Sequence, residues 1–231
     1  MLLLTGFSTE SISVAEIYKS DNDVFLEGCT VVKGTRLIVL TWREGLILEF
    51  DIFSKTLTRT FDYEFEGWGI AYADDRNELW ASDGSSVLRV LDPTGMRVIR
   101  ECSVWLSIDG HRRIEVKYMN ELEFVGGRLF ANIYIPAGIP RSPNYVVAID
   151  PDSCYVTRVY PAFDLNVETD SGHVMNGISS SLSGDSGEIF VTGKHWNAIH
   201  LLRLEAAPSS TPAIASHLSI ARFLSMNLSF R

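Results

Sequence analysis

Residues 66–104 decide the fold, and they read EGWGIAYADDRNELWASDGSSVLRVLDPTGMRVIRECSV. The stretch opens on a glutamate, and three runs of alternating apolar and polar residues follow it: NELWASDG, SVLRVLD and MRVIRECSV. β-Branched and aromatic residues are frequent in the runs, and Asp, Gly or Pro stands between them. Alternation with a period of two residues between such breakers predicts short antiparallel β-strands.

The same pattern recurs on both sides of this stretch. Four segments begin on an acid or amide and end on an acidic residue; they begin at Glu27, Glu66, Asn120 and Asn176 and end at Asp51, Asp92, Asp150 and Glu205. A unit of roughly 40–55 residues that is reused along a chain is typical of the blade of a β-propeller. The sequence therefore predicts an all-β propeller with four well-formed blades.

The two ends of the chain fit the repeat less well. Residues 11–18, SISVAEIY, alternate as a strand does, but residues 1–20 hold less than a full blade. Residues 206–213, AAPSSTPA, have the composition of a linker. Residues 214–230 fit either a short amphipathic helix or another strand. We therefore predict a propeller domain over residues 1–205 with an incomplete first blade, followed by a linker and C-terminal tail over residues 206–231.

Composition narrows the classes of function. The chain has 231 residues, 46% of them hydrophobic, which is enough for one core. Its net charge is −9, and its basic residues form no long run, so we expect no nucleic-acid partner. No apolar stretch reaches the length of a membrane span. The chain starts without a basic region before a short apolar run, so we expect no signal peptide, and we assign no compartment.

The sequence contains three cysteines, Cys29, Cys102 and Cys154, each in or beside a predicted strand. We interpret them as buried free thiols, with one disulfide and one spare thiol as the alternative. The chain has no CxxC or HExxH motif, so we expect no metal site of those kinds and no cofactor.

Alignment of the repeats makes certain side chains equivalent. The residues that open the segments are Glu27, Glu66, Asn120 and Asn176, and those that end the next strand run are Trp42, Gly84, Tyr134 and Lys194. Equivalent positions of a propeller converge on its axis, so we expect carboxylates and amides near large side chains and one lysine. This arrangement is typical of a binding or catalytic pocket. The alternative is that individual members are hydrogen-bonding, turn or core residues.

At these residues the chain resembles the plant-type glutaminyl cyclases, also called glutamine cyclotransferases. The matching motifs follow one another in family order: VFLEG (24–28), LTWREG (40–45), EGWGIAY (66–72), SDGSSVLRVLDP (82–93), NELEFVGGRLFANIY (120–134), VMNGI (174–178) and VTGKHW (191–196). The resemblance implies a five-bladed β-propeller. The family's FTQG-like segment is missing, so we expect an N-terminally truncated member whose first blade is partial.

The resemblance also implies an activity. The family converts an N-terminal glutaminyl residue to a pyroglutamyl residue, releases ammonia and requires no catalytic metal. By motif, Glu27 is expected to carry the proton, and Asn120 and Lys194 to contact the substrate and the developing oxyanion. The expected substrate-binding residues are Phe25, Trp42, Trp68, Tyr134 and Asn176. The expected partners are peptides that begin with glutamine, and we expect a monomer.

These residue types suit the chemistry. One carboxylate can take a proton from the attacking α-amine and return it to the leaving nitrogen. A lysine and an amide donor can stabilise the negative charge that gathers on the tetrahedral oxygen. An aromatic pocket can fold the glutamine side chain back toward its own amine.

Two other functions remain open at this point. One is a divalent-metal propeller hydrolase of the lactonase type, in which Glu27, Asn120 and Asn176 would hold Ca²⁺ through oxygen atoms. The other is an interaction propeller without catalysis. Sensitivity to EDTA separates the metal hydrolase from the cyclase, whose chemistry should survive chelation.

Overall fold

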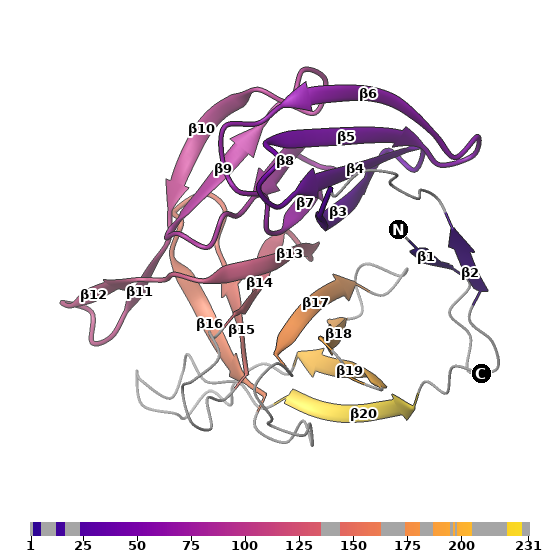
Figure 1. Ribbon diagram of the computed structural model, residues 1–231. Coiled ribbons are helices and arrows are strands. Elements are labelled where there is room, and N and C mark those ends of the chain that lie inside the picture. The colour runs from indigo at the N-terminus through magenta and orange to yellow at the C-terminus, as the bar shows by residue number, and fades with distance from the viewer. Residues whose placement is uncertain are drawn as a thin grey trace.

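The computed structural model describes residues 2–5, 13–16, 24–134, 144–162, 174–180, 187–194, 196, 198–204 and 221–227. The regular structure of these residues is β-strand, with no helix among them (Figure 1). Most of the strands belong to four four-stranded antiparallel sheets, which we call blades A, B, C and D.

Each blade uses four strands in chain order. Blade A contains β3 (Leu26–Val32), β4 (Arg36–Thr41), β5 (Leu46–Asp51) and β6 (Thr56–Asp62). Blade B contains β7 (Ile70–Ala73), β8 (Glu78–Ala81), β9 (Val87–Leu91) and β10 (Val98–Ser103). Blade C contains β13 (Met119–Val125), β14 (Arg128–Ile133), β15 (Tyr145–Ile149) and β16 (Val156–Pro161). Blade D contains β17 (Met175–Ser180), β18 (Glu188–Gly193), β19 (Ala198–Leu204) and β20 (Ala221–Asn227).

The four blades form a propeller-like arrangement. The first strand of each blade lies innermost, and β3, β7, β13 and β17 contact one another in that order. Two short strands, β1 (Leu2–Thr5) and β2 (Ser13–Glu16), form a separate pair that Figure 1 shows between blade D and blade A. A further hairpin, β11 (Trp105–Ser107) and β12 (Arg113–Glu115), lies between blades B and C in the sequence. The all-β propeller prediction is confirmed to this extent.

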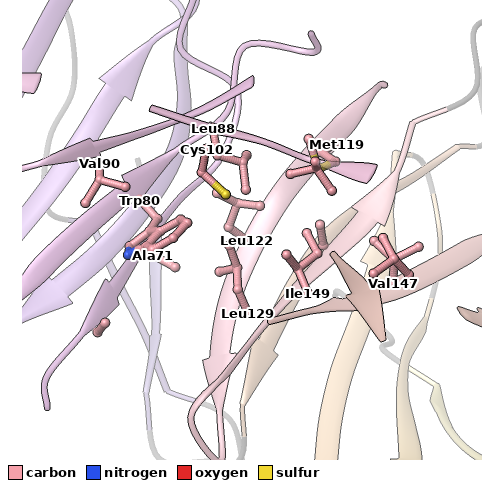
Figure 2. Packing of buried hydrophobic residues seen from close by; sticks show 14 residues of the cluster. Ala71, Trp80, Leu88, Val90, Cys102, Met119, Leu122, Leu129, Val147 and Ile149 are labelled. Carbon is pink, nitrogen blue, oxygen red and sulfur yellow. The ribbon is translucent and has the colours of Figure 1, made fainter. Parts of the chain in front are cut away.

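The core is divided into layers between neighbouring blades. Figure 2 shows the layer between blades B and C, where Trp80, Leu88, Met119, Leu122 and Leu129 pack together. The second strands of blades A, B and C are buried on both faces between their end positions, and so β4, RLIVLT, is apolar at its four central positions. The outer strand β6, TLTRTFD, is largely exposed and polar, as an edge strand should be.

The structure corrects our interpretation of the cysteines. Cys102 on β10 and Cys154 form a disulfide between blades B and C, with their Cα atoms 5.7 Å apart, and Cys29 is free. The main-chain N–H of Trp105, just after β10, donates a hydrogen bond to the carbonyl of Cys154. This contact brings the two cysteines together across 52 residues of sequence. The alternative of one disulfide and one spare thiol therefore holds. The prediction of three buried free thiols is wrong, because two of the cysteines are bonded and Cys29 is exposed.

The stretch that we interpreted as a tail contains β20. This strand pairs in antiparallel register with the whole of β19, from Ala198 opposite Asn227 to Leu204 opposite Ala221. Of the two alternatives for residues 214–230, the strand is the one found for residues 221–227.

Candidate active site

The structure brings all eight predicted site residues to one cavity of about 240 Å³. Its lining consists of Phe25, Glu27, Trp42, Trp68, Asn120, Tyr134, Asn176 and Lys194. These residues come from the starts of innermost strands, or from just before them, and from the ends of the second strands. Both kinds of position lie at the same end of an antiparallel blade, which explains how residues from four blades meet.

Glu27, near the start of β3, and Lys194, just after β18, are the charged residues of this lining. Burial raises the pKa of the Glu27 carboxyl above its ordinary value, and the positive charge of Lys194 acts in the opposite direction. The protonated form of Glu27 is therefore accessible closer to neutral pH than it is for a surface glutamate. A carboxyl in this state can act both as an acid and as a base.

Two glycines let the inner strands approach closely beside Glu27. The N–H of Gly28 donates a 2.7 Å hydrogen bond to the carbonyl of Trp68. A Cβ atom on Gly28 would lie 2.5 Å from that carbonyl oxygen, and one on Gly69 would lie 2.6 Å from the Cα atom of Glu121. Only glycine fits at these positions, and so Glu27, Trp68 and Glu121 are held on backbones that are in contact.

Aromatic rings form two walls of the cavity. Phe25 packs edge-on against Trp42 with ring centroids 5.7 Å apart, and Trp68 packs edge-on against Tyr134 at 5.8 Å. Gly84 has a φ of +80°, and a Cβ atom there would lie 2.5 Å from the Trp68 ring. Gly84 therefore makes room for the indole and does not line the cavity itself.

Glu66 and Arg43 contact the rings of Trp68 and Trp42 and link the two walls, a role that the repeat pattern does not predict. Glu66 accepts a hydrogen bond of 3.1 Å from the indole N–H of Trp68. It also lies 3.4 Å from the guanidinium of Arg43, whose carbon atom is 3.8 Å from the centre of the Trp42 ring. Glu66 was expected in the ring of segment-opening residues, but it is not part of the cavity lining. The Glu-Gly pair occurs at 27–28 and again at 66–67, and this repeat predicts that Glu66 lies near the cavity but not that it contacts Arg43 and Trp68.

The amides form a third side of the cavity. Asn120 is 4% exposed, and its side-chain N–H₂ donates to the side-chain oxygen of Asn176, which joins blades C and D. The main-chain carbonyl of Asn120 accepts a 2.7 Å hydrogen bond from the buried hydroxyl of Ser82. An asparagine amide has two N–H donors, so one remains to contact a ligand. Among the described residues, no three His, Cys, Asp or Glu side chains are grouped as metal ligands would be.

The sequence matches one family over most of its length. The family described as "Glutamine cyclotransferase" matches residues 4–204. The Arabidopsis thaliana glutaminyl-peptide cyclotransferase is 30% identical over 199 residues, which cover 84% of this chain and 57% of that protein. The chain thus spans little more than half the length of this relative.

One solved structure shows the same relationship. The Myxococcus xanthus glutaminyl cyclase superposes with a TM-score of 0.65 at 31% identity, over 82% of this chain and 74% of that one. The Kuenenia stuttgartiensis hydrazine synthase superposes with a TM-score of 0.51 at 14% identity, over 91% of this chain and 53% of that one, which is a likeness of fold alone. No described helix of this chain is long and apolar enough to cross a membrane.

Proposed function

Because this chain belongs to the glutamine cyclotransferase family, we propose that it converts the N-terminal glutamine of peptides to pyroglutamate and releases ammonia. The observation that carries the proposal is the cavity of about 240 Å³ whose lining combines Glu27 and Lys194 with two pairs of aromatic rings. Its partners are peptides with a free N-terminal glutamine, and we propose that it acts as a monomer.

The reaction joins the substrate's α-amine to its own γ-amide carbon. We assign Glu27 to accept the proton that the amine loses as the new C–N bond forms. The γ-carbonyl oxygen becomes negative in the tetrahedral intermediate, and Lys194 with the remaining N–H of Asn120 stabilises it. Glu27 then returns the proton to the γ-nitrogen, the old C–N bond breaks and ammonia leaves. Atoms and charges balance without any other reactant.

The aromatic walls supply the geometry of ring closure. A free glutamine side chain samples many rotamers, and few of them bring its amide carbon to the amine. The Phe25–Trp42 and Trp68–Tyr134 pairs enclose the side chain, so the entropy of folding it back is lost on binding and not at the chemical step. We assign Asn176 to hold Asn120 in place through the hydrogen bond between their amides.

We further propose that the complete fold is five-bladed, with β1 and β2 belonging to the fifth sheet. Their place between blades D and A supports this (Figure 1). The division into a propeller domain over residues 1–205 and a tail over residues 206–231 remains a prediction, and β20, which lies within residues 206–231, is the fourth strand of blade D.

The test is product formation by the full chain. A Gln-initiated dipeptide should lose the mass of one ammonia and release ammonia into solution. The same dipeptide with an acetylated amine should not react, because its nitrogen cannot attack. Turnover should persist in EDTA. A folded chain that forms no pyroglutamate would overturn the proposal, and activity lost in EDTA and restored by Ca²⁺ would favour the metal hydrolase.

A further inference from the structure

Glu121 lies beside the proposed site and takes no part in the mechanism given above. It follows Asn120 on β13, and its main-chain N–H donates a 3.0 Å hydrogen bond to the side-chain oxygen of Asn132. Asn132 is fully buried and is itself fixed by a 2.8 Å hydrogen bond to the carbonyl of Met175. The backbone of Glu121 is therefore held in place beside Leu122, which is buried between blades B and C.

The carboxyl of Glu121 has acidic neighbours. Both Glu27 and Glu123 act on it electrostatically, and among the described residues no lysine or arginine forms an ion pair with it. The strands that carry Glu27 and Glu121 lie on either side of the segment that leads into β7. Gly28, next to Glu27, packs against the backbone of Gly69, and Gly69 packs against the backbone of Glu121. Because the two carboxyl groups interact, ionisation of Glu27 makes ionisation of Glu121 less favourable.

Burial is the main reason that Glu121 resists ionisation, and Glu27 and Glu123 add to it, so its pKa is raised to about 8. Lys194 acts on Glu27 and favours the ionised form of that residue. Desolvation and the charges of Glu121 and Glu123 raise the pKa of the Cys29 thiol to about 12, so Cys29 stays neutral although this residue is exposed. The order of ionisation is therefore Glu27 first and Glu121 second.

The groups that interact with Glu121 lie on three strands, β3, β13 and β14. Strand β7, IAYA, contributes no charged side chain. The others contribute Glu27 and Cys29 from β3 and Glu123 from β13, which interact with Glu121 electrostatically, and Asn132 from β14, which accepts its main-chain N–H. Burial raises the pKa of the Glu123 carboxyl, and the main-chain N–H of Ser180, which donates to this carboxyl at 2.9 Å, acts in the opposite direction.

We propose that Glu121 is a positioning residue that shares one negative charge with Glu27, holding a proton itself so that Glu27 is the carboxylate offered to the substrate's amine. The inference rests on the proposed cyclase activity. While Glu121 is neutral, the pocket carries the single charge that the proton transfer requires. Once Glu121 ionises, its charge raises the pKa of Glu27 and opposes the oxyanion beside Lys194, so turnover should fall.

The first test compares kcat of the wild-type chain and Glu121→Gln between pH 6 and pH 9.5. Glutamine imitates the protonated carboxyl, so the two proteins should turn over at similar rates below pH 7. The ratio of variant to wild-type kcat should rise about ten-fold between pH 7 and pH 9, since about a tenth of a group with this pKa stays protonated one unit above it. A ratio that is constant with pH would overturn the proposal, because a purely structural role lowers the rate equally at every pH.

Glu123→Gln is the matched control on the same strand. This substitution removes a negative charge that raises the pKa of Glu121, so Glu121 should ionise at a lower pH than in the wild type. The fall in kcat of Glu123→Gln at alkaline pH should therefore begin at a lower pH than that of the wild type. Glu121→Gln should abolish this loss and Glu123→Gln should only move it. If kcat falls at the same alkaline pH in the wild type, Glu121→Gln and Glu123→Gln, the proposal that Glu27 and Glu121 share one charge is contradicted.

A readout that needs no activity separates this inference from the proposed function. The infrared carbonyl band of a protonated carboxylic acid should be present in the wild-type chain at pH 6.5 and lost at pH 9.5. At pH 6.5 the intensity of this band should be lower in Glu121→Gln than in the wild type, by the contribution of one carboxylic acid. If the wild type makes no pyroglutamate and the band titrates as described, the proposed function fails while the shared proton stands. If no band is lost in that range, the inference fails.

Discussion

The N–H of Gly28 and the carbonyl oxygen of Trp68 form a 2.7 Å hydrogen bond that joins the first blade described here to the second. It places the residue after the proposed proton carrier in direct contact with a wall of the cavity. The hydrogen bond exists only because Gly28 has no side chain. The backbone of the neighbouring blade occupies the space that a Cβ atom would need.

Gly28→Ala should therefore destabilise the fold and the site together. The methyl group would lie 2.5 Å from the Trp68 oxygen and 2.6 Å from the Cα atom of Gly69, so two backbones must separate. Overpacking of this kind costs about 1–3 kcal/mol, which urea unfolding would measure. Gly95→Ala is the control, because its nearest neighbour would be a movable Asp92 carboxylate at 3.3 Å. Equal stability of the two variants would contradict the tight contact.

The repeats explain why the sequence could predict which residues meet at the cavity but not the contacts of Glu66 with Arg43 and Trp68. Glu27, Asn120 and Asn176 open equivalent segments, and Trp42, Tyr134 and Lys194 end equivalent runs, so alignment alone places them at one end of the blades. The contact of Glu66 with Arg43 and Trp68 depends on side-chain directions between two blades, which no period in the sequence encodes.

Two other features of the fold could not be read from local pattern. The pairing of Cys102 with Cys154 depends on how blades B and C dock, and a sequence with three cysteines does not state which of them meet. Residues 221–227 carry a short apolar pattern that suits a helix or a strand. The neighbouring strand β19, which supplies the pairing, decides between them.

The thiol count tests the disulfide and Cys29 together. In the folded chain, an aromatic disulfide reagent should detect one thiol at most, Cys29, which is free and exposed. Unfolding without reductant should reveal one thiol, and unfolding with reductant three. Three thiols in the unreduced, unfolded protein would contradict the bond between Cys102 and Cys154. Replacing both of these cysteines by alanine should cost about 2–4 kcal/mol of stability.

Lys194→Met should change both the rate and its pH dependence. The positive charge of Lys194 lowers the pKa of Glu27, and its loss should move the acidic limb of the rate profile to higher pH. The rate itself should fall about 10²–10³-fold if Lys194 stabilises the oxyanion. Lys55→Met, at an exposed turn of blade A, is the control and should leave both properties unchanged. An unmoved acidic limb in Lys194→Met would contradict the coupling to Glu27.

The stability of the chain should reflect the raised pKa of Glu121. Because this pKa is about 8 when folded and near 4.5 when unfolded, the folded state binds the proton more tightly. The carboxyl therefore costs no stability below pH 4.5, and its cost grows as pH rises toward 8. The Tm of Glu121→Gln should match that of the wild type at pH 5 and exceed it at pH 9. A Tm difference that is the same at both pH values would show that Glu121 titrates normally.

The central claim is that Glu27 carries the proton, and turnover of Glu27→Gln tests it most directly. Glutamine preserves the shape of the side chain and removes the acid–base group, so the fold should persist while ammonia release from a Gln-initiated dipeptide falls about 10²–10⁴-fold. Glu64→Gln, at an exposed position before blade B, controls for the loss of a negative charge and should keep wild-type activity. A folded Glu27→Gln protein with unchanged turnover would contradict the account.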